Sequence, residues 1–342
     1  MSTTNFEPKL RDEGATELHI SPGFAHCALK TSRKRLKVAL DDVRTGLSNH
    51  HVHALRTTSR RASAGIALLS LAAPRRAARR LLDDLRRERQ QFSTIRNCDA
   101  LLEVMLAWSD AADRDLLTDL LVQVALRRAR EERRIRNGGL QPRSRRILRR
   151  FRKLMVDVER RLAESPCRFR DSLFAASRKP MERLRQASES SCVELPVEQP
   201  AACTVELSTV PPVDLYSEIL GWHPVRIACK RLRYLLEFVE EMLPANVGQL
   251  VFQQLREAQS RLGYLLDTAA ALHYLRTRDT TNESTQDSLA RDRIQHAQEE
   301  KLQAAYAAFR AWWSAGRLHE QVASLIEDQG DWAPSAGEIP AE

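Results

Sequence analysis

Two stretches of the chain share one pattern: HALRTTSRR occupies residues 53–61, and HPVRIACKR occupies residues 223–231. Both read H-x-x-R-x-x-x-(R/K)-R. In an α-helix, side chains at positions i, i+3 and i+7 lie on one stripe. The pattern therefore predicts two helices that each carry a row of cations, namely His53, Arg56 and Arg60 in the first and His223, Arg226, Lys230 and Arg233 in the second.

Such a row needs a partner of opposite charge. Like charges three or four residues apart destabilise an isolated helix by roughly a few tenths of a kcal/mol per pair. In the second copy, Glu237 extends the same stripe and could act as an internal partner, whereas Arg61 and Arg231 would lie at the margin of each row. A row that recurs in two helices therefore favours a bound anion or an acidic neighbour.

The composition agrees with a helical protein. Among 342 residues there are only 12 Gly and 14 Pro, which leaves few turns for a many-stranded sheet. We therefore expect an all-α fold, which makes all-β architectures and nucleotide-fold enzymes unlikely, and the length suits two domains or two repeats. We expect helix breaks at Ser48–His51, Pro74, Asp110–Asp113, Asn137–Gly139, Ser165–Pro166 and Pro244, and in the polar run Thr277–Asp287.

Composition also divides the chain into segments. Residues 1–21 are polar and unpatterned and are expected to form a flexible tail, and Ser21-Pro22 is a start signal for the first helix. Helical blocks are expected at 22–190 and 214–328. Between them, residues 191–213 are rich in Ser and Pro and read as a linker, and residues 329–342 form a C-terminal tail.

The net charge of +9 is unevenly distributed. Residues 1–23 carry −2, residues 24–190 carry +20 and residues 191–342 carry −9. An excess of this size favours a polyanionic partner, and nucleic acid, an anionic membrane and inorganic phosphate chains all qualify. Of the 54 basic residues, 46 are Arg, and arginine suits bidentate phosphate contacts. A codon bias towards arginine would explain the same count, in which case these residues would lie on solvated helix surfaces.

The sequence contains no pattern typical of a zinc cluster, another metal site or a membrane span. The six cysteines form no C-x-x-C pair, and His50, His51 and His53 lack the spacing and the carboxylates of a metal site. We therefore expect no metal and no cofactor. The longest apolar run, Gly65–Pro74, is about half of what a bilayer span needs, so we expect a soluble, cytoplasmic protein without membrane association.

A second segment follows each motif, with FSTIRN at residues 92–97 and LGYLLD at residues 262–267. With these segments the chain resembles the conserved-histidine α-helical domain (CHAD) family, whose members carry two such motif helices, each followed by an L-G-x-x-x-D segment. Ser93 and Asn97 depart from the usual Gly and Asp of that segment. The resemblance implies two antiparallel four-helix bundles related by a pseudo-twofold axis, with a basic groove or pore between them, and the binding of inorganic polyphosphate.

The resemblance also implies which residues bind phosphate. They are the motif residues His53, Arg56, Arg60, Arg61, His223, Arg226, Lys230, Arg231 and Arg233. Spacing adds Lys30, Arg33 and Lys37 on the first helix, and Arg127 and Arg128 are weaker additions. We interpret the motif histidines as hydrogen-bond donors to phosphate or as partners that orient arginine.

Three functions compete. The leading one is non-enzymatic binding of polyphosphate in the cytoplasm, with polyphosphate granules as an expected location. Nucleic-acid binding through the basic half is the alternative, although the rows carry almost no aromatic residues for base stacking except Tyr234. A phosphohydrolase or phosphotransferase would need carboxylates for Mg²⁺, which the motifs lack. The sequence predicts neither an oligomeric state nor a chain-length preference.

Overall fold

The structure is a computed structural model, and it describes residues 19–108, 114–138, 141–191, 215–239, 245–277 and 285–327. The predicted all-α fold is confirmed. The helices are α1 (Pro22–Thr45), α2 (Asn49–Leu68), α3 (Arg75–Gln91), α4 (Ser93–Leu106), α5 (Arg114–Asn137), α6 (Gln141–Glu164), α7 (Phe169–Ser191), α8 (Leu215–Gly221), α9 (His223–Val239), α10 (Ala245–Thr277), α11 (Thr285–Gly316) and α12 (Leu318–Glu327). Two short strands, β1 (His19–Ile20) and β2 (Cys167–Arg168), pair antiparallel.

Several helix ends coincide with predicted signals, whereas the breaks at Phe92, Trp222 and Arg317 were not predicted. The Ser21 hydroxyl accepts a hydrogen bond from the Phe24 amide at 3.1 Å, and Pro22 occupies the first turn of α1. Ser48 caps α2 in the same way through the His51 amide at 3.2 Å. Pro74 directly precedes α3. Residues 1–18 of the predicted N-terminal tail, the whole C-terminal tail, nearly all of the linker and the breaks at Asp110–Asp113 and Pro244 lie outside the described residues. The last three residues of the predicted N-terminal tail are ordered in the fold, because His19 and Ile20 form β1 and Ser21 caps α1.

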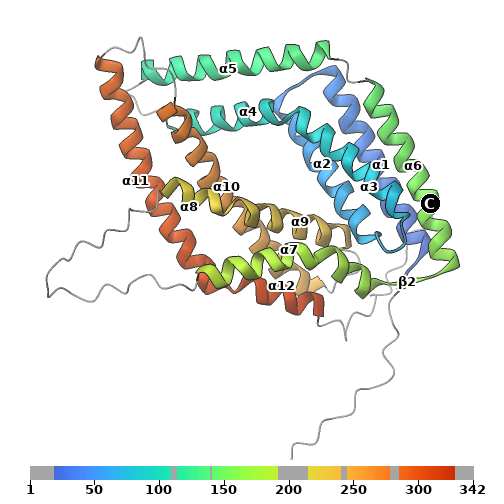
Figure 1. The fold of residues 1–342 in the computed structure, drawn as a ribbon. Helices are drawn as coiled ribbons and strands as arrows, with labels where there is room; N and C mark the ends of the chain where they lie inside the picture. The colour runs from blue at the N-terminus through green and yellow to red at the C-terminus, as the bar shows by residue number, and fades with distance from the viewer. Residues whose placement is uncertain are drawn as a thin grey trace, which may run out of the picture.

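The helices pack as two groups of four. In the first group each helix contacts the next in the order α1, α2, α3, α6, and α6 contacts α1 again. The second group is arranged in the same way, in the order α7, α9, α10, α12. Figure 1 shows α5 and α11 running along the outside of these groups. This packing is compatible with the two expected bundles, and the pseudo-twofold relation between them stays a prediction.

Helix α7 differs from the expected division of the chain. The predicted boundary at residue 190 assigns it to the first block, but α7 packs against α9 and α12 of the second group. The Ser- and Pro-rich stretch that follows α7 marked the end of the block, and periodicity does not reveal which neighbour buries an apolar stripe. The packing partner of α7 is therefore a tertiary feature.

The two motif helices bury equivalent positions. Five residues of α2 are buried together with the residues that lie 170 positions later in the chain. The pairs are Val52 and Trp222, Leu55 and Val225, Ser59 and Cys229, Ala62 and Leu232, and Ile66 and Leu236. The helices also contact each other directly. At this contact a Cβ atom on Gly65 would overlap the Phe238 ring, so glycine permits the close approach. The motif rows are thereby held on facing helices.

Candidate anion-binding site

A cavity of about 620 Å³ lies where the two motif helices face each other. Its walls come from α2 and α9, with further residues from α4, α5, α8 and α10. Seven of the fourteen predicted site residues line it together, namely His53, Arg56, Arg60, Arg127, His223, Arg226 and Lys230. The structure thus brings both copies of the motif into one site.

The lining is strongly cationic. Asp267 is its only carboxylate, and the Asp267 Oδ2 lies 3.6 Å from the Arg226 Nη2. Against this single negative charge stand six basic side chains: Arg56, Arg60, Arg96, Arg127, Arg226 and Lys230. An excess of this kind in a confined space attracts anions and focuses a positive field.

Contacts within and between helices hold several of these cations in place. The Arg56 Nη1 donates to the Arg89 carbonyl oxygen at 2.7 Å, and the Arg96 Nη1 lies 3.5 Å from the Glu103 Oε2. A Cβ atom on Gly263 would lie only 3.2 Å from the Arg226 Nη2, so glycine gives that guanidinium room against α10. This is a physical role for the glycine of the LGYLLD segment.

Burial, followed by the neighbouring positive charges, lowers the pKa values of the cations in the cavity. Burial, with Arg226 and Arg60 nearby, lowers the pKa of Lys230 to about 7. Burial and the neighbouring Arg60 and Arg96 lower the pKa of Arg56 to about 10. An anion in the cavity would relieve this repulsion and favour the charged forms.

The two motif histidines respond in the same direction. Partial burial, followed by the charges of nearby cations, lowers the pKa of both His53 and His223 below the usual value of 6.5. Both imidazoles are therefore neutral at physiological pH in the unliganded site. A neutral imidazole still offers one N–H donor to a phosphate oxygen.

Four predicted residues point elsewhere. Glu237 accepts hydrogen bonds from Arg61 and from Arg233, each at 2.9 Å. Arg128 contacts Asp99 at 2.6 Å and Glu132 at 3.0 Å. Arg231 lines a different cavity. Each of these residues lies outside the lining of the motif cavity.

The predicted residues of α1 also lie outside that lining. Lys37 pairs with Asp41 at 2.8 Å, and the Arg33 Nε donates to the Leu148 carbonyl of α6 at 3.4 Å. Lys30 is exposed. Helix α1 contacts α2 and α6, which directs these side chains away from the site.

Sequence reasoning did not select Arg96, Asp267 or His273 as site residues, although all three line the cavity. Arg96 belongs to the FSTIRN segment and Asp267 ends LGYLLD, so the second repeated segment was a signal for both. His273 stacks on Tyr216 with ring centroids 5.0 Å apart, which no sequence pattern indicates.

In the described part of the chain, no group of three His, Cys, Asp or Glu side chains could hold a metal ion. No described helix combines the length and the apolar character that crossing a membrane requires.

A family model described as CHAD domain matches residues 27–276. Among solved structures, the CHAD domain from the plant Ricinus communis is similar, with 19% sequence identity and a TM-score of 0.52. The alignment covers 91% of this chain and 95% of that chain. PptA from Streptomyces chartreusis is 18% identical, with a TM-score of 0.57 and coverages of 86% and 99%. No curated protein matches.

Proposed function

The chain belongs to the CHAD domain family, and we propose that it binds inorganic polyphosphate in the motif cavity without catalysing a reaction on it. One observation carries the proposal: six basic side chains from two repeated motifs and their neighbours surround one cavity that holds a single carboxylate. A linear phosphate chain carries about one charge per phosphate. Rows of donors on facing helices match that regular charge, and release of counterions would drive binding.

The lining favours polyphosphate over nucleic acid. Binders of single-stranded nucleic acid combine basic grooves with aromatic side chains on which bases stack. Of the cavity residues only Tyr274 carries a Phe, Tyr or Trp ring. A polyanion without bases therefore suits this surface better.

The same lining supports binding without catalysis. Phosphoryl transfer commonly uses Mg²⁺ held by carboxylates. In the cavity, Asp267 stands alone and already faces the Arg226 guanidinium. We expect no release of phosphate from long-chain polyphosphate in the presence of Mg²⁺ or Mn²⁺, and turnover that is lost in His223→Ala would contradict this part of the proposal.

The experiment that tests the proposal compares two double variants by isothermal titration with long-chain polyphosphate. Arg226→Ala/Lys230→Ala removes one Arg and one Lys from the cavity. Arg152→Ala/Lys153→Ala removes the same charges from an exposed face of α6 and is the matched control. We expect at least tenfold weaker binding in the first variant and about unchanged binding in the second, because charge-assisted contacts contribute about 1.5–3 kcal/mol each.

Competition separates the possible polyanions. Duplex DNA and RNA are added to the polyphosphate complex at equal charge concentration and about physiological salt. Polyphosphate should remain bound, since the cavity offers phosphate donors but few stacking surfaces. Displacement by either nucleic acid would assign the cavity to that polymer instead.

A cytoplasmic location at polyphosphate granules is the corresponding cellular proposal. A fluorescent fusion of the unaltered chain should form foci that coincide with stained granules. The Arg226→Ala/Lys230→Ala fusion should be diffuse, whereas granule foci that survive this change would uncouple location from the cavity.

A further inference from the structure

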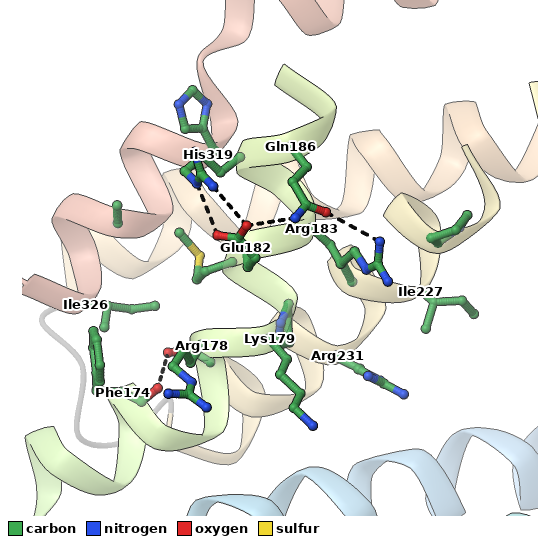
Figure 2. Close-up of a pocket in the computed structure, with 17 residues that line it drawn as sticks. Phe174, Arg178, Lys179, Glu182, Arg183, Gln186, Ile227, Arg231, His319 and Ile326 are labelled. Carbon is green, nitrogen blue, oxygen red and sulfur yellow. Dashed lines mark hydrogen bonds and ion pairs between the residues drawn. The ribbon is translucent and has the colours of Figure 1, made fainter. Parts of the chain in front are cut away.

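A second cavity, of about 970 Å³, lies between α7, α9 and α12, as Figure 2 shows. It uses a different face of the second motif helix. Ile227 borders both cavities, but Lys230 lines only the motif cavity and Arg231 lines only this one. We call it the α7 cavity. The proposed function makes no use of it.

The floor of the α7 cavity is apolar. Met181 of α7, Ile227 of α9 and both Ala323 and Ile326 of α12 contribute to it. Pro180, inside α7, adds a buried ring. Inorganic polyphosphate has no apolar part that could use such a floor, so this site suits an organic molecule.

The rim of the α7 cavity is cationic. Arg178, Lys179 and Arg231 are exposed, and within the described residues none of them forms an ion pair. Glu182 is the one carboxylate of the lining, and Arg185 already pairs with it at 2.8 Å. Figure 2 shows the Arg178 and Lys179 side chains projecting from α7 and the Arg231 side chain projecting from α9. The rim is therefore complementary to an anion.

An aromatic ring stands beside these cations. Phe174 lines the cavity with 53% of its surface exposed, one helical turn before Arg178 on α7. A planar group can stack on the exposed face of this ring. The volume lies near the upper end of the range of small-molecule sites, about 300–1,000 Å³.

From this combination we propose that the α7 cavity binds an organic phosphate of nucleotide size. Its planar ring system would pack against Phe174 and the apolar floor, and its phosphates would contact Arg178, Lys179 and Arg231. No covalent step is involved. The site is separate from the motif cavity and does not depend on the polyphosphate proposal.

The test uses ATP as the probe and tripolyphosphate as the comparator, both in buffer with EDTA. The protein is the full chain carrying Arg226→Ala/Lys230→Ala, so that the motif cavity contributes little to either affinity. We expect ATP to bind at least about tenfold more tightly than tripolyphosphate, because only ATP can use the floor and the ring. Equal affinities for the two probes would overturn the proposal.

Variants of the α7 cavity then locate the binding. Phe174→Ala should weaken ATP binding about fivefold or more through lost stacking while leaving tripolyphosphate unchanged. Val156→Ala, an exposed apolar residue of α6, is the matched control. Lys179→Ala/Arg231→Ala should weaken both probes. ATP binding that resists both changes would place the nucleotide elsewhere.

A last probe tests the planar group. Decyl phosphate carries an anionic head and an apolar chain without a ring. We expect it to bind at least tenfold more weakly than ATP. Binding as tight as that of ATP would mean that the cavity takes an anionic lipid-like molecule, an alkyl phosphate, and not a nucleotide. Loss of polyphosphate binding in other experiments would leave all of these outcomes unaffected.

Discussion

Raising the pH from about 6.5 to about 9 should weaken polyphosphate binding, and Lys230 should set the slope. In the free protein, burial and the adjacent Arg226 and Arg60 lower the pKa of Lys230 to about 7. Phosphate oxygens around the ammonium would return this pKa toward its ordinary value of about 10.4. At a pH of about 9, binding must therefore be accompanied by uptake of a proton.

The magnitude follows from these two pKa values. At a pH about two units above the pKa of free Lys230, the cost of protonating this lysine weakens binding by a factor of up to about 100, which is about 2.7 kcal/mol. Since the side chain is half-buried, we expect the loss to be about 10- to 100-fold. His53 and His223 have lowered pKa values, so their protonation would strengthen binding towards the acidic end of this range and below it, and it contributes little to the loss above a pH of about 7.5.

The assay is isothermal titration at a pH of about 8 in two buffers of different ionisation enthalpy, which counts protons taken up on binding. We expect about 0.9 proton per site. Lys230→Arg is the control, because its guanidinium stays charged throughout and the terminal phosphates of the polymer titrate equally in both experiments. A pH slope that is the same in Lys230→Arg and in the unaltered chain would refute the role of Lys230.

Three further predictions concern packing and stability. Gly263→Ala should weaken polyphosphate binding several-fold with helicity intact, because the added methyl group would displace the Arg226 guanidinium, and titration with circular dichroism checks both. Gly65→Ala should destabilise the fold by about 1–3 kcal/mol in urea denaturation through overlap with the Phe238 ring, and Phe238→Leu in the same chain should restore part of the loss. Lys230→Met should raise the Tm of the free protein at a pH of about 6. The lysine pKa is lowered to about 7 by folding, so at a pH below about 7 the folded protein carries a charged lysine that opposes folding. An unchanged Tm would contradict the repulsion assigned to Lys230.

Much of the helix pattern could be read from local sequence. Ser21-Pro22 and Ser48 are capping signals, and each acts within one turn of the helix that it begins. The two motifs predicted one cationic row on each helix because their spacing alone fixes one stripe, and the facing arrangement of the rows was an implication of the family resemblance. The partner of α7 could not be read in this way, since its apolar stripe is compatible with either group of helices.

The candidate site was predictable where helix geometry decides it. His53, Arg56 and Arg60 share a stripe and enter the cavity together. Arg61 lies one residue further, which is a rotation of about 100°, and pairs with Glu237 instead. Arg233 belongs to the second row but lies at its far end, and it also pairs with Glu237. The position of a cation around and along the row therefore decides whether it enters the cavity.

Distant neighbours decided the remaining positions. Arg127 and Arg128 are adjacent in sequence, but the first lines the cavity and the second pairs with Asp99 of α4. The contact of α4 with α5 selects between them. Local patterns carry no information on such a choice, because it depends on the packing of two helices.

The salt dependence of polyphosphate binding tests the central claim most directly. For a flexible polyanion, the slope of log K against log salt concentration changes by about 0.7 for each phosphate contact. We predict a slope that is shallower by about 1.4 in Arg226→Ala/Lys230→Ala and unchanged in Arg152→Ala/Lys153→Ala. Equal slopes in the two variants would show that the general positive field, rather than the motif cavity, holds the polymer.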